Sequence, residues 1–169
     1  FMKKIKILFI CVFVFNLNSC HIKMNGSFRS LYSYYKKSHK ENPLIYSKLE
    51  SSQSICDISK KTAKTNVVII NGENLNDCIK TTKKALIYIW GSNCKSKICY
   101  PPEIVQSVCN SEKIQLFVVA EYYDNEAMII DYAIERPIFG IDTKYYKSNL
   151  TDKYLTRFLN DLNIAKETT

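Results

Sequence analysis

Short apolar runs alternate with amphipathic stretches along residues 66–169. Apolar runs rich in β-branched residues predict buried strands, and apolar residues spaced three and four positions apart predict helices that bury one face. We therefore expect strands at residues 67–70, 85–90, 114–120 and 137–142, helices at 74–83, 101–110, 124–134 and from 151 onward, and a turn with a short strand at 143–148. Because strands and helices alternate, the pattern predicts a layered α/β domain.

Two of these elements frame the middle of the domain. Residues 85–90 read ALIYIW and are apolar at every position, which is typical of a central parallel strand buried on both faces. The helix predicted at residues 101–110 begins with two prolines and would direct four residues inward: Ile104, Val105, Val108 and Cys109.

Residues 1–19 have the pattern of a secretory signal. Basic residues precede an apolar run at residues 5–15, which is too short to span a bilayer comfortably. The segment ends in Leu-Asn-Ser-Cys, which resembles a lipobox and implies cleavage before Cys20 and lipidation of the Cys20 sulfur. An uncleaved anchor or a signal without lipidation is the alternative.

Residues 20–65 are predicted to form a basic, partly helical arm between the anchor and the domain. Aromatic and apolar residues from Phe28 to Tyr35 recur at helical spacing, and Asn42-Pro43 is a favourable helix start. The chain carries a net charge of +8, and residues 1–65 hold twelve basic against three acidic side chains. A basic arm beside a lipid anchor favours an anionic membrane surface, and a solvated linker is the alternative. We expect no nucleic-acid partner, because the arm has no recognisable binding motif.

The segment at residues 90–102 reads WGSNCKSKICYPP and places two cysteines, Cys94 and Cys99, between a predicted strand and a predicted helix. It resembles the active-site motif of the thioredoxin-like superfamily, especially envelope-anchored bacterial thiol-disulfide oxidoreductases. In that alignment Trp90 takes the place of the first tryptophan of the motif, Cys94 that of the nucleophile, and Pro102 that of the helix proline. The second cysteine of the family's C-x-x-C falls on Lys97, so the pair here is C-x4-C.

A second segment, Arg136-Pro-Ile-Phe-Gly-Ile-Asp142, resembles the segment of that superfamily that carries a cis-proline facing the nucleophile. The resemblance implies a thioredoxin-like fold, with a central mixed sheet and helices on both faces. It also implies a cis bond before Pro137, and substrate binding by Trp90, Arg136 and Pro137.

Seven cysteines occur in the chain, and five remain after removal of the signal and lipidation of Cys20. Cys94 and Cys99 form either a reversible dithiol or a static disulfide that braces the loop. Cys78 and Cys109 lie on helices that cover opposite faces of the family's sheet, so Cys56 is free to pair with either one. The two histidines, His21 and His39, both lie in the arm. We therefore expect neither a metal site nor a cofactor.

Two functional hypotheses follow. The first is a lipoprotein of the bacterial cell envelope, facing the periplasm, that exchanges disulfides with exported cysteine-containing proteins or an envelope redox partner. Cys94 would attack and Cys99 would resolve the mixed disulfide. Lys95 and Lys97, which follow Cys94, would stabilise its thiolate, and the start of the following helix would favour Cys99 instead. The second hypothesis is a non-catalytic thioredoxin-fold lipoprotein that serves as a binding or structural module.

Overall fold

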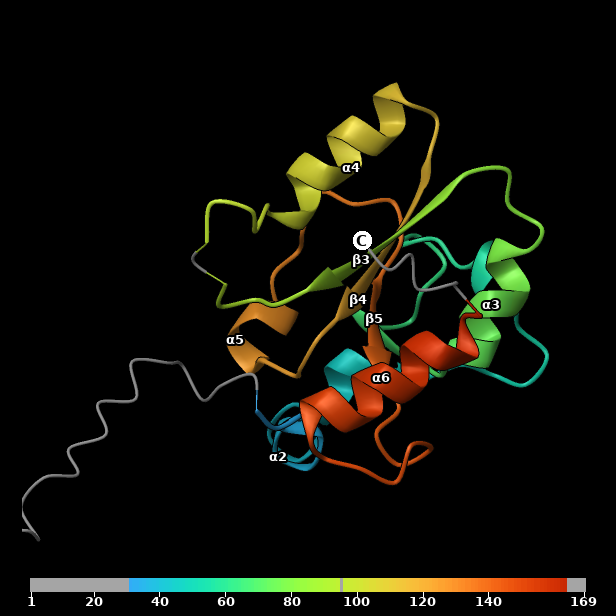
Figure 1. Ribbon diagram of the computed structural model, residues 1–169. Helices are drawn as coiled ribbons and strands as arrows, with labels where there is room; N and C mark the ends of the chain where they lie inside the picture. The colour runs from blue at the N-terminus through green and yellow to red at the C-terminus, as the bar shows by residue number, and fades with distance from the viewer. Residues whose placement is uncertain (1–30, 95, 164–169) are drawn as a thin grey trace, which may run out of the picture.

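A computed structural model describes residues 31–94 and 96–163 (Figure 1). Its sheet has five strands, which are β1 (Tyr46–Lys48), β2 (Val67–Ile70), β3 (Ala85–Trp90), β4 (Gln115–Ala120) and β5 (Ile138–Ile141). The α-helices are α2 (Tyr35–Glu41), α3 (Gly72–Ile79), α4 (Pro102–Ser111), α5 (Asn125–Met128) and α6 (Thr151–Asp161), and the 3-10 helices are η3 (Pro43–Ile45) and η4 (Ile55–Asp57). The α/β class predicted from the alternating pattern is confirmed.

The sheet has the strand order β1-β2-β5-β4-β3, and every pair of neighbours is parallel. The expected mixed sheet is therefore not found among the described residues. Residues 143–148, expected to include a short strand, form turns, and β5 lies between β2 and β4 in the same direction as both.

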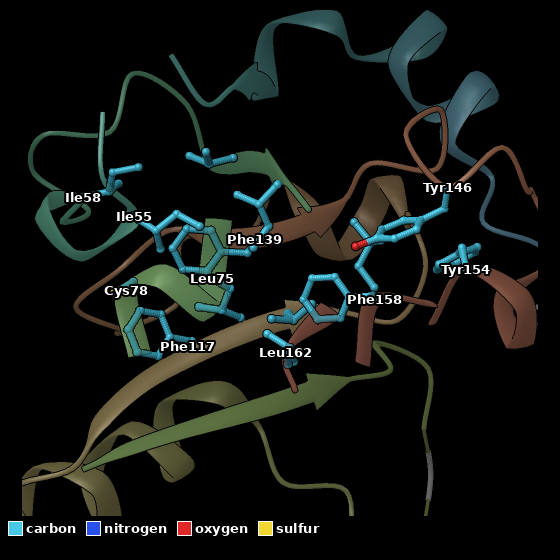
Figure 2. Packing of buried hydrophobic residues seen from close by; sticks show 14 residues of the cluster. Ile55, Ile58, Leu75, Cys78, Phe117, Phe139, Tyr146, Tyr154, Phe158 and Leu162 are labelled. Atoms are coloured by element: carbon cyan, nitrogen blue, oxygen red, sulfur yellow. The ribbon is translucent and has the colours of Figure 1, made fainter. Parts of the chain in front are cut away.

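Helices cover both faces of the sheet, and strand residues alternate between two apolar clusters. On one face, side chains such as Phe139 pack with Leu75 of α3 and Phe158 of α6, as Figure 2 shows. On the other face, Val118 of β4 belongs to a cluster with Tyr35 of α2, Cys109 of α4 and Met128 of α5. Two buried faces require strands without a polar side, which explains the continuous apolar runs in the sequence.

The strand expected at the centre of the sheet, β3, lies at its edge. The crossover through α3 carries the chain from β2 past the positions later filled by β5 and β4. Ala85 and Leu86 are consequently exposed, and only Trp90 of this strand is buried. The following helix, α4, is also less buried than expected: Cys109 is buried, but Ile104 and Val108, expected to face inward, are exposed.

The described part of the predicted arm, residues 31–65, contributes to the same core. Tyr46 pairs with Val67, so β1 extends the sheet, and Ile55 and Ile58 are each only 1% exposed. The helix expected after Asn42 is instead the single 3-10 turn η3 followed by β1. Cys20 and the predicted signal lie outside the described residues.

A second expected helix, at residues 124–134, is also shorter, because α5 ends at Met128. Among the helices that the structure describes, none combines the length and apolar character needed to cross a membrane.

Candidate functional site: the Cys94–Cys99 loop

Cys94 and Cys99 form a disulfide in the loop between β3 and α4. This loop lies where the parallel strands end, which we call the carboxyl edge of the sheet, and the side where the strands begin is the amino edge. Their Cα atoms are 5.9 Å apart. Cys94 is exposed, whereas Cys99 is half-buried. The Cys94 N–H donates to the Gly91 carbonyl and the Cys99 N–H to the Ser96 carbonyl, each over 3.0 Å, so each cysteine closes a tight turn. Cys94 is therefore the more exposed of the two cysteines.

The first half of this loop is held by the connection between β4 and α5. The Asn93 N–H donates to the Tyr122 hydroxyl over 3.1 Å, and the Ser92 hydroxyl donates to the Asp124 carboxylate over 3.2 Å. The Asn93 side-chain amide also donates to Asp124. The same carboxylate accepts hydrogen bonds from Glu126 and Ala127 N–H and so caps α5. One residue thus couples the disulfide loop to a helix start.

The second half of the loop is held by β3 and ends in α4. The Tyr88 hydroxyl donates to the Tyr100 carbonyl over 2.7 Å, and Pro102 occupies the first turn of α4. Burial raises the pKa of the Tyr88 hydroxyl. The side chains of Ile98 and Tyr100 are exposed beside the disulfide. The loop therefore presents apolar surface next to its accessible sulfur.

Trp90, predicted to contact substrate, ends β3 directly before the loop. It is 6% exposed, and its ring packs edge-on against Tyr132 with centroids 5.2 Å apart. Trp90 thus lies directly beside the cysteine loop, but its side chain belongs to the buried core beneath the loop and not to the surface.

Arg136 and Pro137, also predicted to contact substrate, lie at the opposite edge of the sheet from the cysteines. They precede β5, whereas Cys94 follows β3, and the two strands run in the same direction. A six-residue strand separates its two ends by roughly 20 Å. The peptide bond between Arg136 and Pro137 is trans, since the described residues contain no cis peptide bond. The expected cis bond is therefore wrong, and the two predicted motifs do not meet.

The Arg136 side chain instead ties residues 55–58 to the sheet. Its guanidinium donates to the carbonyls of Ile55, Cys56 and Ile58 over 3.1, 2.9 and 2.8 Å, and lies 4.9 Å from the Phe117 ring centroid. Burial lowers the pKa of this group. Arg136 and Pro137 also line a pocket of about 880 Å³ at the amino edge, together with Lys60, Lys61 and Lys64. This pocket is a feature separate from the disulfide loop.

Three residues of the candidate site were not found from the sequence: Glu121, Tyr122 and Asp124. All three follow β4, and residues that follow neighbouring parallel strands meet at the same edge of a sheet. A Cβ on Gly91 would lie 2.8 Å from the Glu121 carboxylate, so Glu121 closely borders the loop. Burial raises the pKa of the Glu121 carboxyl. These residues could be assigned to the site only once β4 was known to lie beside β3, and the sequence pattern does not specify the strand order.

The remaining described cysteines are a second disulfide and a buried thiol. Cys56 pairs with Cys78, one of the two partners that the sequence left open, and joins η4 to α3. Cys109 is buried in the cluster under α4, and burial raises the pKa of its thiol. Within residues 31–94 and 96–163, no group of three or more histidine, cysteine or acidic side chains is arranged to hold a metal.

Comparisons with protein-family models, with curated proteins and with solved structures gave no significant match. The described residues form an α/β domain with a parallel sheet covered on both faces, and a disulfide at the carboxyl edge of that sheet joins the exposed Cys94 to the half-buried Cys99.

Proposed function

We propose that this chain is a thiol-disulfide exchange protein of thioredoxin-like type, anchored in the bacterial cell envelope, and that Cys94–Cys99 is its reversible pair. One observation carries the proposal: an exposed cysteine, Cys94, is disulfide-bonded to the half-buried Cys99 within a short loop at the carboxyl edge of the sheet. The resemblance of residues 90–102 to the superfamily motif and the signal-like N-terminus support it.

The exchange follows from the unequal exposure of the two cysteines. A thiolate of an exported protein attacks the Cys94 sulfur, a bond forms between those two sulfurs, and the Cys94–Cys99 bond breaks. The electron pair of that bond leaves on Cys99 as a thiolate. A second thiolate of the substrate then attacks its own sulfur in the mixed disulfide and releases Cys94. The substrate is oxidised to a disulfide and the protein is reduced to two thiols, and the reverse sequence reduces a substrate disulfide.

This proposal departs from the superfamily pattern in two respects. The sheet is wholly parallel, and Pro137 is at the other edge, so the proposed mechanism gives it no part. Substrate would instead be held by groups around the loop itself.

A redox titration of the purified protein in glutathione buffers tests the proposal, with the state of each cysteine read by alkylation and peptide mass. A reversible pair titrates with a midpoint above about −300 mV, whereas structural disulfides of secreted proteins lie below about −300 mV. The Cys56–Cys78 disulfide, measured in the same sample, is the internal control. A Cys94–Cys99 midpoint no higher than that of Cys56–Cys78 would reject the exchange function.

The second candidate is a non-catalytic binding module in which Cys94–Cys99 is a static brace. The 880 Å³ pocket at the amino edge favours it, because lysines and apolar side chains, including Lys61, Ile130 and Ile138, line a hollow that the exchange reaction does not use. This candidate replaces the first if the pair resists glutathione.

A further inference from the structure

The outer side of β3 is an open sheet edge within the described residues, because the strand order ends there. The carbonyls of Lys84 and Trp90 accept hydrogen bonds from Gln115 and Glu121 of the β4 segment, over 3.0 and 2.9 Å. In a strand, successive residues direct their backbone groups to opposite sides. The N–H and C=O groups of the alternate residues, Ala85, Ile87 and Ile89, are therefore directed to the open side.

This open edge leads directly into the disulfide loop, as Figure 1 shows for β3. Leu86 on the strand is 40% exposed, and Ile98 in the loop is 78% exposed. An exposed edge with unpaired backbone groups and apolar side chains is a template on which an extended segment adds as a further strand. A segment paired along Ala85 to Ile89 would bring its end to Cys94.

The charges around the edge indicate which segment fits. Lys83 and Lys84 precede β3, Lys97 lies in the loop after it, and Lys113 is near the start of β4; all four are exposed. In an antiparallel pair of two β3 strands, the lysines before one strand would lie against Lys97 of the other copy. Like charges therefore oppose self-pairing, and acidic groups at the ends of an added strand are favoured.

We propose that the open edge of β3 is the substrate-docking surface, and that it takes an extended, cysteine-bearing segment with apolar alternate residues and acidic flanks. This inference rests on the proposed exchange function and adds its substrate class. The docked cysteine thiolate attacks the Cys94 sulfur, forms the mixed disulfide and releases Cys99 as a thiolate, so no further oxidant or reductant is needed.

The first test compares two synthetic peptides that share an apolar, single-cysteine core and differ only in acidic or lysine flanks. Each is reacted with the oxidised protein, the freed Cys99 is trapped by alkylation, and the mixed disulfide is followed by mass. At low salt the acidic peptide should react about 10-fold faster, and the difference should shrink as salt screens the charges. The double variant K83E/K84E, which changes only exposed side chains, should reverse the preference. Equal rates for the two peptides would overturn the docking inference.

The second test blocks the edge itself. Ile87→Pro removes an N–H group that is directed to the open side of β3 and leaves the hydrogen bonds to β4 in place. The control is Lys48→Pro, at the other outer strand of the sheet, β1. The Leu49 N–H donates to the Ile69 carbonyl, so Leu49 faces β2 and the N–H of Lys48 is directed away from the sheet. Thermal unfolding of both variants reports whether the sheet is intact. Ile87→Pro should reduce the ratio of the acidic-peptide rate to the glutathione rate about 10-fold, and Lys48→Pro should not. If Ile87→Pro unfolds, the charge reversal decides alone.

The outcomes separate the two proposals. If the oxidised protein exchanges with neither glutathione nor either peptide, the exchange function itself fails. If it exchanges with glutathione but the peptides and variants show no difference, only the docking surface is wrong. A protein that is dimeric in solution and becomes monomeric on Ile87→Pro would show that a second copy occupies the edge, and would also overturn the inference.

Discussion

Cys94 and Cys99 are chemically alike but lie in different surroundings. Cys94 is exposed at the start of the loop, whereas Cys99 is half-buried three residues before α4. Exposure gives an incoming group access and keeps a thiolate solvated, while the helix start favours a negative charge closer to Cys99. The exposure of Cys94, and its position in the motif that residues 90–102 resemble, favour Cys94 as the attacking residue in the proposed exchange.

In the reduced protein we expect Cys94 to be alkylated faster than Cys99 near neutral pH. The rates are measured across pH with each cysteine followed by peptide mass, and Cys94→Ser and Cys99→Ser serve as matched controls. Faster labelling of Cys99 would exchange the two roles. Rates at both sites equal to those of free cysteine, with an apparent pKa near ~8.5, would leave no activated thiol.

Glu121 provides a pH-dependent contribution to stability. Burial raises the pKa of its carboxyl above the ordinary 4.5, so the folded state binds the proton more tightly than the unfolded state. The stabilisation this gives is present below that ordinary value and is lost as pH rises through the folded-state pKa. Glu121→Gln should therefore raise the free energy of unfolding above that of the wild type at pH 7, and the gain should disappear at acidic pH. Denaturant unfolding across pH checks this, with exposed Glu112→Gln as the control; a gain independent of pH would contradict it.

At the scale of elements, the disulfide loop depends on its neighbour rather than on its own sequence. The connection between β4 and α5 supplies Tyr122 and Asp124, which hold Ser92 and Asn93. The short α5 in turn depends on the Asp124 cap.

Asp124→Ala should destabilise the domain by about 1–2 kcal/mol, as expected for loss of a helix cap. It should also change the rate of exchange between Cys94–Cys99 and glutathione, because the loop loses two hydrogen bonds. Asp124→Asn keeps an acceptor oxygen, so its stability and exchange rate should lie between those of the wild type and Asp124→Ala. Asp152→Ala, at an exposed position, is the control for a lost acidic residue. Denaturant unfolding measures the loss of stability, and acid-quenched exchange with glutathione measures the rate. An unchanged exchange rate would show that Asp124 does not position the loop.

The two disulfides close loops of different length. In the chain-entropy description, the Cys56–Cys78 bond, with a sequence separation of 22, stabilises the fold by about 3 kcal/mol, and the Cys94–Cys99 bond, with a separation of 5, by about 2 kcal/mol. Cys56→Ala/Cys78→Ala should therefore lower the free energy of unfolding more than Cys94→Ala/Cys99→Ala does. Denaturant unfolding of both double variants checks this. The opposite order would indicate that the Cys94–Cys99 disulfide is the main structural brace.

For the whole molecule, strand direction decides which residues share an edge. Because β5 runs parallel to β3, residues before β5 and residues after β3 lie at opposite edges of the sheet. Arg136 and Pro137 are therefore separated from Cys94, and the groups after β4 take their place beside the loop. The pocket at the amino edge and the disulfide at the carboxyl edge are consequently two independent surfaces.

The predicted membrane attachment belongs to this scale. When the full chain is expressed in a bacterium with lipoprotein-processing enzymes, we expect the mature protein to begin at a lipidated Cys20 and to fractionate with membranes. Cys20→Ala should abolish lipidation, since no other residue replaces the modified sulfur. Mass spectrometry of the mature N-terminus and detergent-free fractionation measure both, with Cys109→Ala as a matched cysteine control. A mature protein that retains residues before Cys20 would reject the prediction.

The sequence by itself determined the α/β class and most of the elements, because local apolar runs and helical periodicity reflect burial at each position. It located the strands at 67–70 and 85–90, the helices near 102 and 151, and the cysteine loop between β3 and α4. These properties depend on neighbours along the chain.

Only the tertiary structure decided the order and direction of the strands, which depend on contacts far apart in sequence. An apolar strand such as β3 looks central because Trp90 and the residues before it are hydrophobic, yet the crossover through α3 places it at the edge. Because β5 runs parallel to β3, Pro137 lies at the opposite end of the strands from Cys94, and residues 143–148 form turns instead of a further strand. Which residues lie beside the Cys94–Cys99 loop therefore depends on which strands end at the same side of the sheet, and no local sequence pattern encodes that arrangement.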